Sequence, residues 1–214
     1  TVAVPEVRGE DGGAMAAVRV VDETRAMMDG YLEKTFLKTA SLMANACRAV
    51  AMLSSESGAE RDAEDLDEGE AAGATALERR RAATAASFGE ALGMAFQLVD
   101  DALDFAGDAE VMGKPAGASD LRSGVVTAPV IFAAAEDETV LEALGDVAAG
   151  GEAGEVAVKR VVEAVARSRG VEKTRGLARA YVEAAVAELV RELPPSEPRS
   201  ALINLGNIVL AREK

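Results

Sequence analysis

The chain has 214 residues, of which 37 are acidic and 23 are basic, giving a formal charge of −14. This charge repels nucleic-acid phosphates and anionic membrane surfaces, so we expect no nucleic-acid partner. The sequence holds no histidine and a single cysteine, Cys47. It therefore excludes histidine-based catalytic triads, zinc sites built on His or Cys, and an intrachain disulfide. No apolar run reaches the roughly 20 residues that cross a bilayer, so we expect no membrane span.

Composition and patterning predict an all-α fold. Alanine is abundant, aromatic residues make up only 3% of the chain, and no stretch shows the alternation typical of strands. After a linker-like stretch over residues 1–13, the expected helices cover residues 14–53, 75–105, 125–135, 139–148, 155–169, 172–193 and 199–213. Gly30 is the candidate break in the first helix. With no internal repeat and no domain boundary in view, we expect one all-helical domain over residues 1–214.

Residues 54–74 differ from their surroundings in charge. They hold eight acidic residues against one arginine, Arg61. Blocks of like charge repel one another and stay solvated. We therefore expect residues 54–74 to form a disordered or extended acidic loop.

The most informative segment is the end of the second long helix, residues 93–105. At about 100° per residue, four polar side chains in it share one helix face. These are Gln97, Asp100, Asp101 and Asp104. The rest of the helix surface is apolar, which predicts a buried helix with an acidic stripe.

Neighbouring carboxylates in a partly buried stripe repel one another and need cations to stay ionised. A hard divalent metal meets that need, because Mg²⁺ takes oxygen ligands and is usually shared between one or two carboxylates and a substrate phosphate. The spacing thus favours Asp100, Asp101 and Asp104 as magnesium ligands. The alternative is a helix face paired with lysines from a neighbouring helix.

Two basic features accompany the stripe. Along residues 31–48, polar side chains recur at helical spacing and carry three cations; they are Lys34, Lys38, Ser41, Asn45 and Arg48. Taken alone, this pattern favours a solvated face over an anion site. The second feature is Lys114, in a Gly- and Pro-rich loop over residues 113–120, where it can swing over an anion held by the aspartates. The ordinary alternative is a loop lysine with no ligand.

Together these segments resemble the carboxyl-terminal portion of the trans-prenyltransferase family, the polyprenyl diphosphate synthases. Residues 96–104 resemble the family's second aspartate-rich motif, and Lys38 with Thr39 resembles its Lys-Thr pair. Residues 113–115 and 120–129 resemble the loop and helix that follow. The similarity is densest to long-chain, solanesyl-type synthases, at residues 31–42 and 126–132. The resemblance implies an isoprenoid-synthase-type helical bundle.

The resemblance also implies an activity. In this family Mg²⁺ holds the diphosphate of an allylic substrate, whose departure gives a carbocation that the double bond of isopentenyl diphosphate attacks. By this resemblance Asp100, Asp101 and Asp104 hold metal. Four further residues carry catalytic or substrate-binding roles: Lys38, Thr39, Gln97 and Lys114. The implied partners are an allylic diphosphate, isopentenyl diphosphate and a second subunit, in a homodimer or a heterodimer.

The sequence departs from the family pattern in its first part. The family's first aspartate-rich motif precedes the Lys-Thr pair, whereas Asp11, Asp22 and Asp29 are too dispersed to form it. The expectation is therefore a partial bundle without its leading helices. Relative to the family pattern, the acidic residues 54–74 look like an insertion. We expect such a truncated chain to have little activity by itself.

Two alternatives of other classes accompany this hypothesis. The first is a non-catalytic partner subunit of a heteromeric prenyl diphosphate synthase, although a pure partner has no use for an intact aspartate stripe. The second is a terpene cyclase, which the scarcity of aromatic side chains disfavours. The resemblance is compatible with the cytoplasm, plastids and mitochondria, and it sets no product length.

Overall fold

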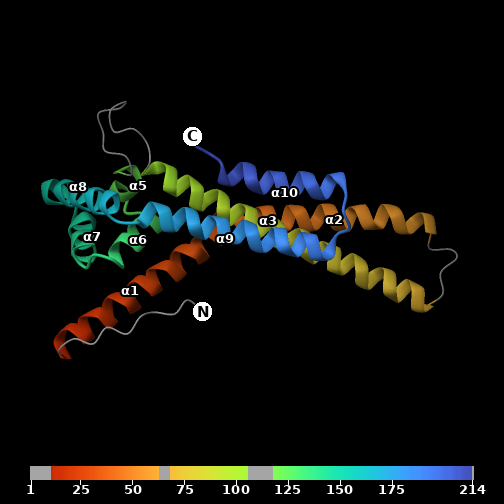
Figure 1. Ribbon diagram of the computed structural model, residues 1–214, viewed down its shortest axis with the longest axis horizontal. Helices are drawn as coiled ribbons and strands as arrows, with labels where there is room; N and C mark the ends of the chain where they lie inside the picture. Colours follow the sequence, from red (N-terminus) through yellow and green to blue (C-terminus); the bar gives the residue numbers. More distant parts are fainter. Residues whose placement is uncertain (1–10, 63–67, 106–117, 214) are drawn as a thin grey trace. The chain divides into compact units, whose positions relative to one another are not determined.

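The structure, a computed structural model, describes residues 11–62, 68–105 and 118–213. Over these residues it consists of helices and turns without any strand, which confirms the all-α prediction (Figure 1). None of the described helices is both long and apolar enough to cross a membrane. The chain divides into two compact units, residues 1–31 with 104–173 and residues 32–103 with 174–214. Whether they behave as one domain stays a prediction.

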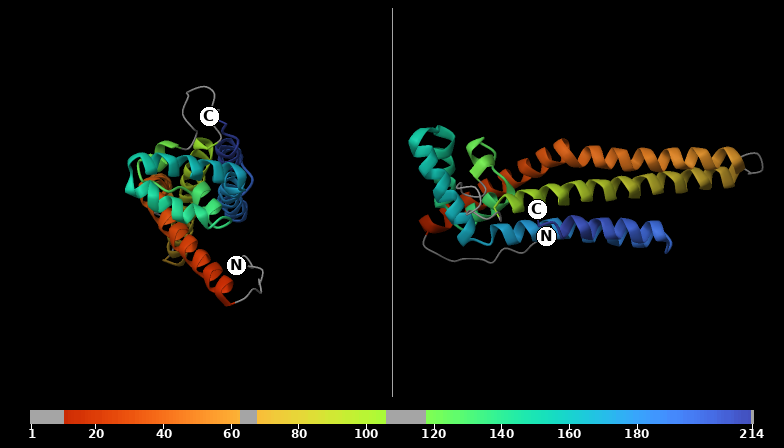
Figure 2. Two further views of the ribbon diagram at one scale, coloured as in Figure 1. Left: turned by 90° about the vertical axis from the view of Figure 1, so that its left-hand side faces the viewer. Right: turned by 90° about the horizontal axis from the view of Figure 1, so that it is seen from above.

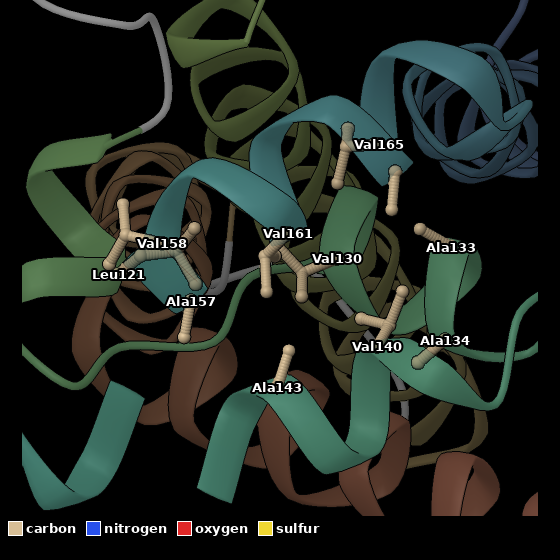
Figure 3. Packing of buried hydrophobic residues seen from close by; sticks show 11 residues of the cluster. Leu121, Val130, Ala133, Ala134, Val140, Ala143, Ala157, Val158, Val161 and Val165 are labelled. Carbon is tan, nitrogen blue, oxygen red and sulfur yellow. The ribbon is translucent and has the colours of Figure 1, made fainter. Parts of the chain in front are cut away.

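Short helices enclose the core of the first unit. They are α5 (Ala118–Arg122), α6 (Ala128–Ala134), α7 (Thr139–Ala149) and α8 (Gly151–Arg167). Figure 3 shows their aliphatic side chains turned toward one another. Leu121, Val130, Val140, Val158 and Val161 are each at most 2% exposed. Burial of one such side chain stabilises a fold by about 1.5–3 kcal/mol, so this cluster holds the unit together.

Glycines set the tight connections of this unit. Gly150 and Gly151 join α7 to α8 with φ angles of 73° and 70°, a region that side chains with a Cβ rarely adopt. At the start of α9 (Gly170–Glu192), an added Cβ on Gly170 would lie 2.3 Å from the carbonyl oxygen of Pro129. The turn at Gly150 and Gly151 folds α8 back against α7. Because Gly170 has no Cβ, α9 can begin in contact with α6.

The first helix runs past its expected break. α1 (Asp11–Thr35) continues through Gly30, so the proposed interruption there is wrong. A single interior glycine costs a helix only about 1 kcal/mol relative to alanine, and its neighbours favour helix. The irregularity lies further on, in a five-residue π-helix, η1 (Phe36–Ala40), after which α2 (Ser41–Asp62) continues the chain.

In the second unit, α2 and α3 (Glu68–Asp104) lie side by side (Figure 2). Two glycines of α3, one turn apart, make the approach close. An added Cβ on Gly89 would lie 2.5 Å from the carbonyl oxygen of Met43, and one on Gly93 would lie 2.6 Å from the Cα of Ala40. Because glycine has no Cβ, backbone packs directly on backbone here. This contact fixes η1 against α3.

The remaining helices of this unit are α9 and α10 (Glu197–Leu210), which fold back on each other after a proline-rich turn (Figures 1 and 2). Ser196 caps α10 by accepting a hydrogen bond from the backbone N–H of Arg199 at 3.3 Å. α9 packs on α3 through Phe88, Ala91, Ala185 and Leu189, which are all buried. Gly206 of α10 contacts Val182 of α9.

The acidic segment differs from its expected conformation. α2 extends to Asp62 and α3 begins at Glu68, so helix covers most of residues 54–74, while residues 63–67 lie outside the described part of the chain. Glutamate and alanine are good helix formers, and a like-charge pair on an exposed helix costs only a few tenths of a kcal/mol. Repulsion over this segment is therefore too weak to prevent helix formation.

Candidate functional site

A chain of hydrogen bonds joins η1 to the acidic helix. The hydroxyl of Thr39 donates to Oε1 of Gln97 at 3.3 Å, and Nε2 of Gln97 donates to Oδ1 of Asp101 at 2.8 Å. All three side chains are buried or partly buried. The structure therefore brings together one residue of the predicted Lys-Thr pair, the predicted glutamine and one predicted metal ligand.

The π-helix explains how Thr39 reaches α3. A π turn contains one residue more than an α turn, so it rotates the following residues by about 100° relative to the preceding ones. Ala40 is fully buried against Gly93, and Thr39 beside it faces Gln97. The sequence pattern did not predict this element. Short π segments in helices frequently occur at functional sites.

The three predicted metal ligands differ in their surroundings. Asp101 is 5% exposed and is held by Gln97. The side chain of Asp100 is 51% exposed. Asp104 is partly buried; it ends α3, and the boundary between the two units falls just before it. The stripe thus contains a buried, oriented carboxylate, Asp101, directly after an accessible one, Asp100.

Arg212, which follows α10, contacts Asp100, the most exposed carboxylate of this stripe. Its Nη2 lies 3.3 Å from Oδ1 of Asp100, and its guanidinium carbon lies 4.3 Å from the centroid of the Phe96 ring. Arg212 was not among the residues predicted from the sequence. No local pattern signals this contact, because the two charged residues are 112 positions apart in sequence.

The basic features have different outcomes. Lys34 and Lys38 are exposed, as are Asn45 and Arg48, which agrees with the solvated-face interpretation of that stripe. Lys38 nevertheless directly precedes Thr39 in η1. Lys114 lies outside the described residues, so its role stays a prediction.

The donor atoms suit magnesium in kind. Asp100 and Asp101 offer only oxygen, which Mg²⁺ prefers, and one or two protein carboxylates completed by water and a phosphate are its usual ligands. Within residues 11–62, 68–105 and 118–213, no three acidic or cysteine side chains gather closely enough to hold a metal ion. The oxygen donors of Asp100 and Asp101 are of the kind that a hard divalent metal such as Mg²⁺ takes.

The sequence model of the polyprenyl synthetase family matches residues 10–165. The chain is 39% identical over 193 residues to a decaprenyl-diphosphate synthase of Dictyostelium discoideum, a match that covers 87% of this chain and 35% of that relative. It is 35% identical over 198 residues to solanesyl-diphosphate synthase 1, mitochondrial, of Oryza sativa. That match covers 90% of this chain and 40% of the relative. The chain therefore belongs to the polyprenyl synthetase family.

Solved structures agree. The apo form of an Arabidopsis medium/long-chain length prenyl pyrophosphate synthase matches with a TM-score of 0.65 and 32% identity, covering 94% of this chain and 64% of that one. A polyprenyl synthase from Caulobacter crescentus, complexed with calcium and isoprenyl diphosphate, matches with a TM-score of 0.63 and 29% identity, covering 94% of this chain and 58% of that one. These matches confirm the predicted isoprenoid-synthase-type helical fold. The chain spans 35% and 40% of the length of the two curated relatives above.

Proposed function

We propose that this chain forms the allylic-diphosphate half of a magnesium-dependent prenyltransferase site, which condenses isopentenyl diphosphate with an allylic diphosphate to a polyprenyl diphosphate. The observation that carries the proposal is the hydrogen-bond chain from Thr39 through Gln97 to Asp101. It joins three residues that the family resemblance had singled out separately. The Caulobacter relative, complexed with a divalent cation and isoprenyl diphosphate, supports it.

In this proposal Asp100 and Asp101 hold magnesium, and Asp104 contributes from the next turn of α3. Magnesium, when bound, neutralises charge on the diphosphate oxygens as the allylic C–O bond breaks. Gln97 fixes the orientation of the Asp101 carboxylate, and Thr39 fixes the amide of Gln97. A buried carboxylate held in this way does not have to reorganise when its ligand arrives.

Lys38 and Lys114 would contact the diphosphate itself. Both are compact cations on flexible stems, suited to oxygens whose charge grows during ionisation. Lys38 lies in η1 next to Thr39. Because Thr39 is hydrogen-bonded to Gln97, this contact keeps the backbone of Lys38 near the acidic stripe. The role of Lys114 rests on the family resemblance alone.

Calorimetric titration of the full chain with a non-hydrolysable geranylgeranyl diphosphate analogue tests this function. We expect binding with Mg²⁺ and none with EDTA. Replacing Asp100, Asp101 and Asp104 by Asn should weaken binding at least about tenfold. A matched control replaces the exposed Glu152, Glu163 and Glu183 by Gln, which changes the net charge equally.

Equal binding by both triple variants would refute the site. The competing function is a non-catalytic subunit that packs on a complete synthase. A folded chain that binds no diphosphate analogue yet recovers a full-length polyprenyl synthase in a pull-down would favour that alternative. Recovery of nothing would count against it.

A further inference from the structure

The side chain of Arg212 lies against two residues of α3 that share one helix face. Phe96 and Asp100 are four positions apart, so their side chains are neighbours on the helix surface. The guanidinium group contacts the Phe96 ring at 4.3 Å and Asp100 Oδ1 at 3.3 Å. One cation therefore occupies both the ring face and the most accessible carboxylate of the stripe.

The position of Arg212 is fixed by the end of α10. The backbone N–H of Ala211 donates to the carbonyl of Asn207 at 3.0 Å, which closes the last turn. One turn earlier, Gly206 packs so closely on Val182 that an added Cβ would lie 2.8 Å from it. Val209 is 6% exposed. The packing of α10 thus holds the base of the arginine side chain beside the stripe.

The guanidinium group is not satisfied by these contacts. Its Nη1 atom is buried and makes no hydrogen bond within the part of the chain that the structure describes. A buried donor without an acceptor is costly, so hydrogen bonding alone does not explain the placement. Charge does, because the guanidinium group lies 3.3 Å from the Asp100 carboxylate and the two opposite charges attract.

We propose that Arg212 is a tethered counter-cation for Asp100 that a divalent metal must displace. The inference rests on the proposed function and adds to it a positioning residue from the far end of the chain. Arg212 and the metal ion compete for the Asp100 carboxylate. Because Arg212 is part of the chain, the fold keeps its guanidinium group near Asp100. Arg212 therefore lowers the affinity of the stripe for free metal, while the Phe96 ring keeps the guanidinium close after displacement.

The test is Mn²⁺ binding by the full chain, measured from the electron paramagnetic resonance signal of free Mn²⁺. An exposed ion pair contributes modestly, so we expect Arg212→Gln to bind Mn²⁺ about two- to fivefold more tightly than the wild type. Arg212→Lys keeps the charge and should bind nearly as the wild type does. Arg191→Gln is the control, since it removes the same charge from an arginine paired with Glu192.

A second variant covers the case in which Arg212→Gln loses its fold by circular dichroism. Phe96→Leu removes the ring but keeps both charges, and it should tighten Mn²⁺ binding in the same direction by a smaller factor. Equal affinity in the wild type and in folded Arg212→Gln or Phe96→Leu chains would overturn the inference while leaving the metal site intact. If no variant and no wild-type chain bound Mn²⁺, the metal site of the proposed function would fail, and this inference with it.

Discussion

Gly93 of α3 lies so close to Ala40 of η1 that an added Cβ would stand 2.6 Å from the Ala40 Cα. That distance is far inside van der Waals contact, and the atom it meets is backbone, which cannot rotate away. α3 can therefore lie this close to the π-helix only because residue 93 is glycine, which has no Cβ. Because the Thr39–Gln97 hydrogen bond spans the same interface, the candidate site depends on it as well.

We predict that Gly93→Ala destabilises the chain by about 1–3 kcal/mol, the usual cost of overpacking. The control is Gly176→Ala, in the interior of α9, where an added Cβ meets nothing within 4 Å. That change should stabilise the helix by up to about 1 kcal/mol, because alanine is the better helix former. Urea denaturation followed by circular dichroism measures both. Equal changes in the free energy of unfolding for the two variants would mean that the Gly93–Ala40 contact leaves room for a methyl group.

Thr39→Val should remove about 0.5–1.5 kcal/mol of stability, since valine keeps the shape of threonine but leaves Oε1 of Gln97 without its donor. Thr39→Ser retains the hydroxyl group and should lose less. The same denaturation experiment compares them. If valine proved as stable as threonine, the hydrogen bond at 3.3 Å would contribute nothing to the fold.

Lys38→Ala should weaken Mg²⁺-dependent binding of the geranylgeranyl diphosphate analogue about tenfold, the usual scale for loss of one charge-assisted contact. Lys34→Ala is a matched control, because Lys34 is also exposed and lies about one turn earlier. Neither change should alter the melting temperature measurably, as both side chains are exposed. Identical affinities in the two variants would argue that the whole stripe is a solvated face.

Leu121→Ala should cost about 2–5 kcal/mol, because Leu121 is 1% exposed and fills the core of the first unit from α5. The comparison is Val156→Ala on α8, at a side chain that is 55% exposed. That substitution should change stability by less than about 0.5 kcal/mol. A small effect of Leu121→Ala would show that α5 contributes little to this core.

The pair Arg122–Glu155 should make stability depend on pH in the acidic range. Three hydrogen bonds of 2.8–3.1 Å join the two side chains, and hydrogen bonding to Arg122 holds the pKa of Glu155 below its ordinary value of 4.5. A lowered folded-state pKa contributes stability above the unfolded-state pKa. That contribution is lost as the pH falls through the folded-state pKa.

Glu155→Gln should therefore melt below the wild type at about pH 7, and the difference should shrink as the pH falls below the ordinary glutamate value of 4.5. Differential scanning calorimetry across this range measures it. The pair is exposed, so the difference should be small and should shrink with added salt. A difference in melting temperature that did not change between about pH 7 and the acidic range would assign it to packing instead of charge.

The sequence alone determined the fold class and placed the polar residues of the stripe on one helix. Helix propensity and apolar spacing are local properties, so most helices after residue 127 lie close to their expected ranges. The spacing of Gln97, Asp100 and Asp101 is by itself enough to place them on one helix face. The short α5 was missed, because five residues in a Gly-rich stretch carry too little periodicity to signal a helix.

Tertiary packing decided how these residues meet. The π-helix and the glycine contact turn Thr39 toward Gln97, and the packing of α10 brings Arg212 to Asp100. Contacts across 58 and 112 positions leave no periodic trace in the chain. They depend on the packing of whole helices, which only the folded structure fixes.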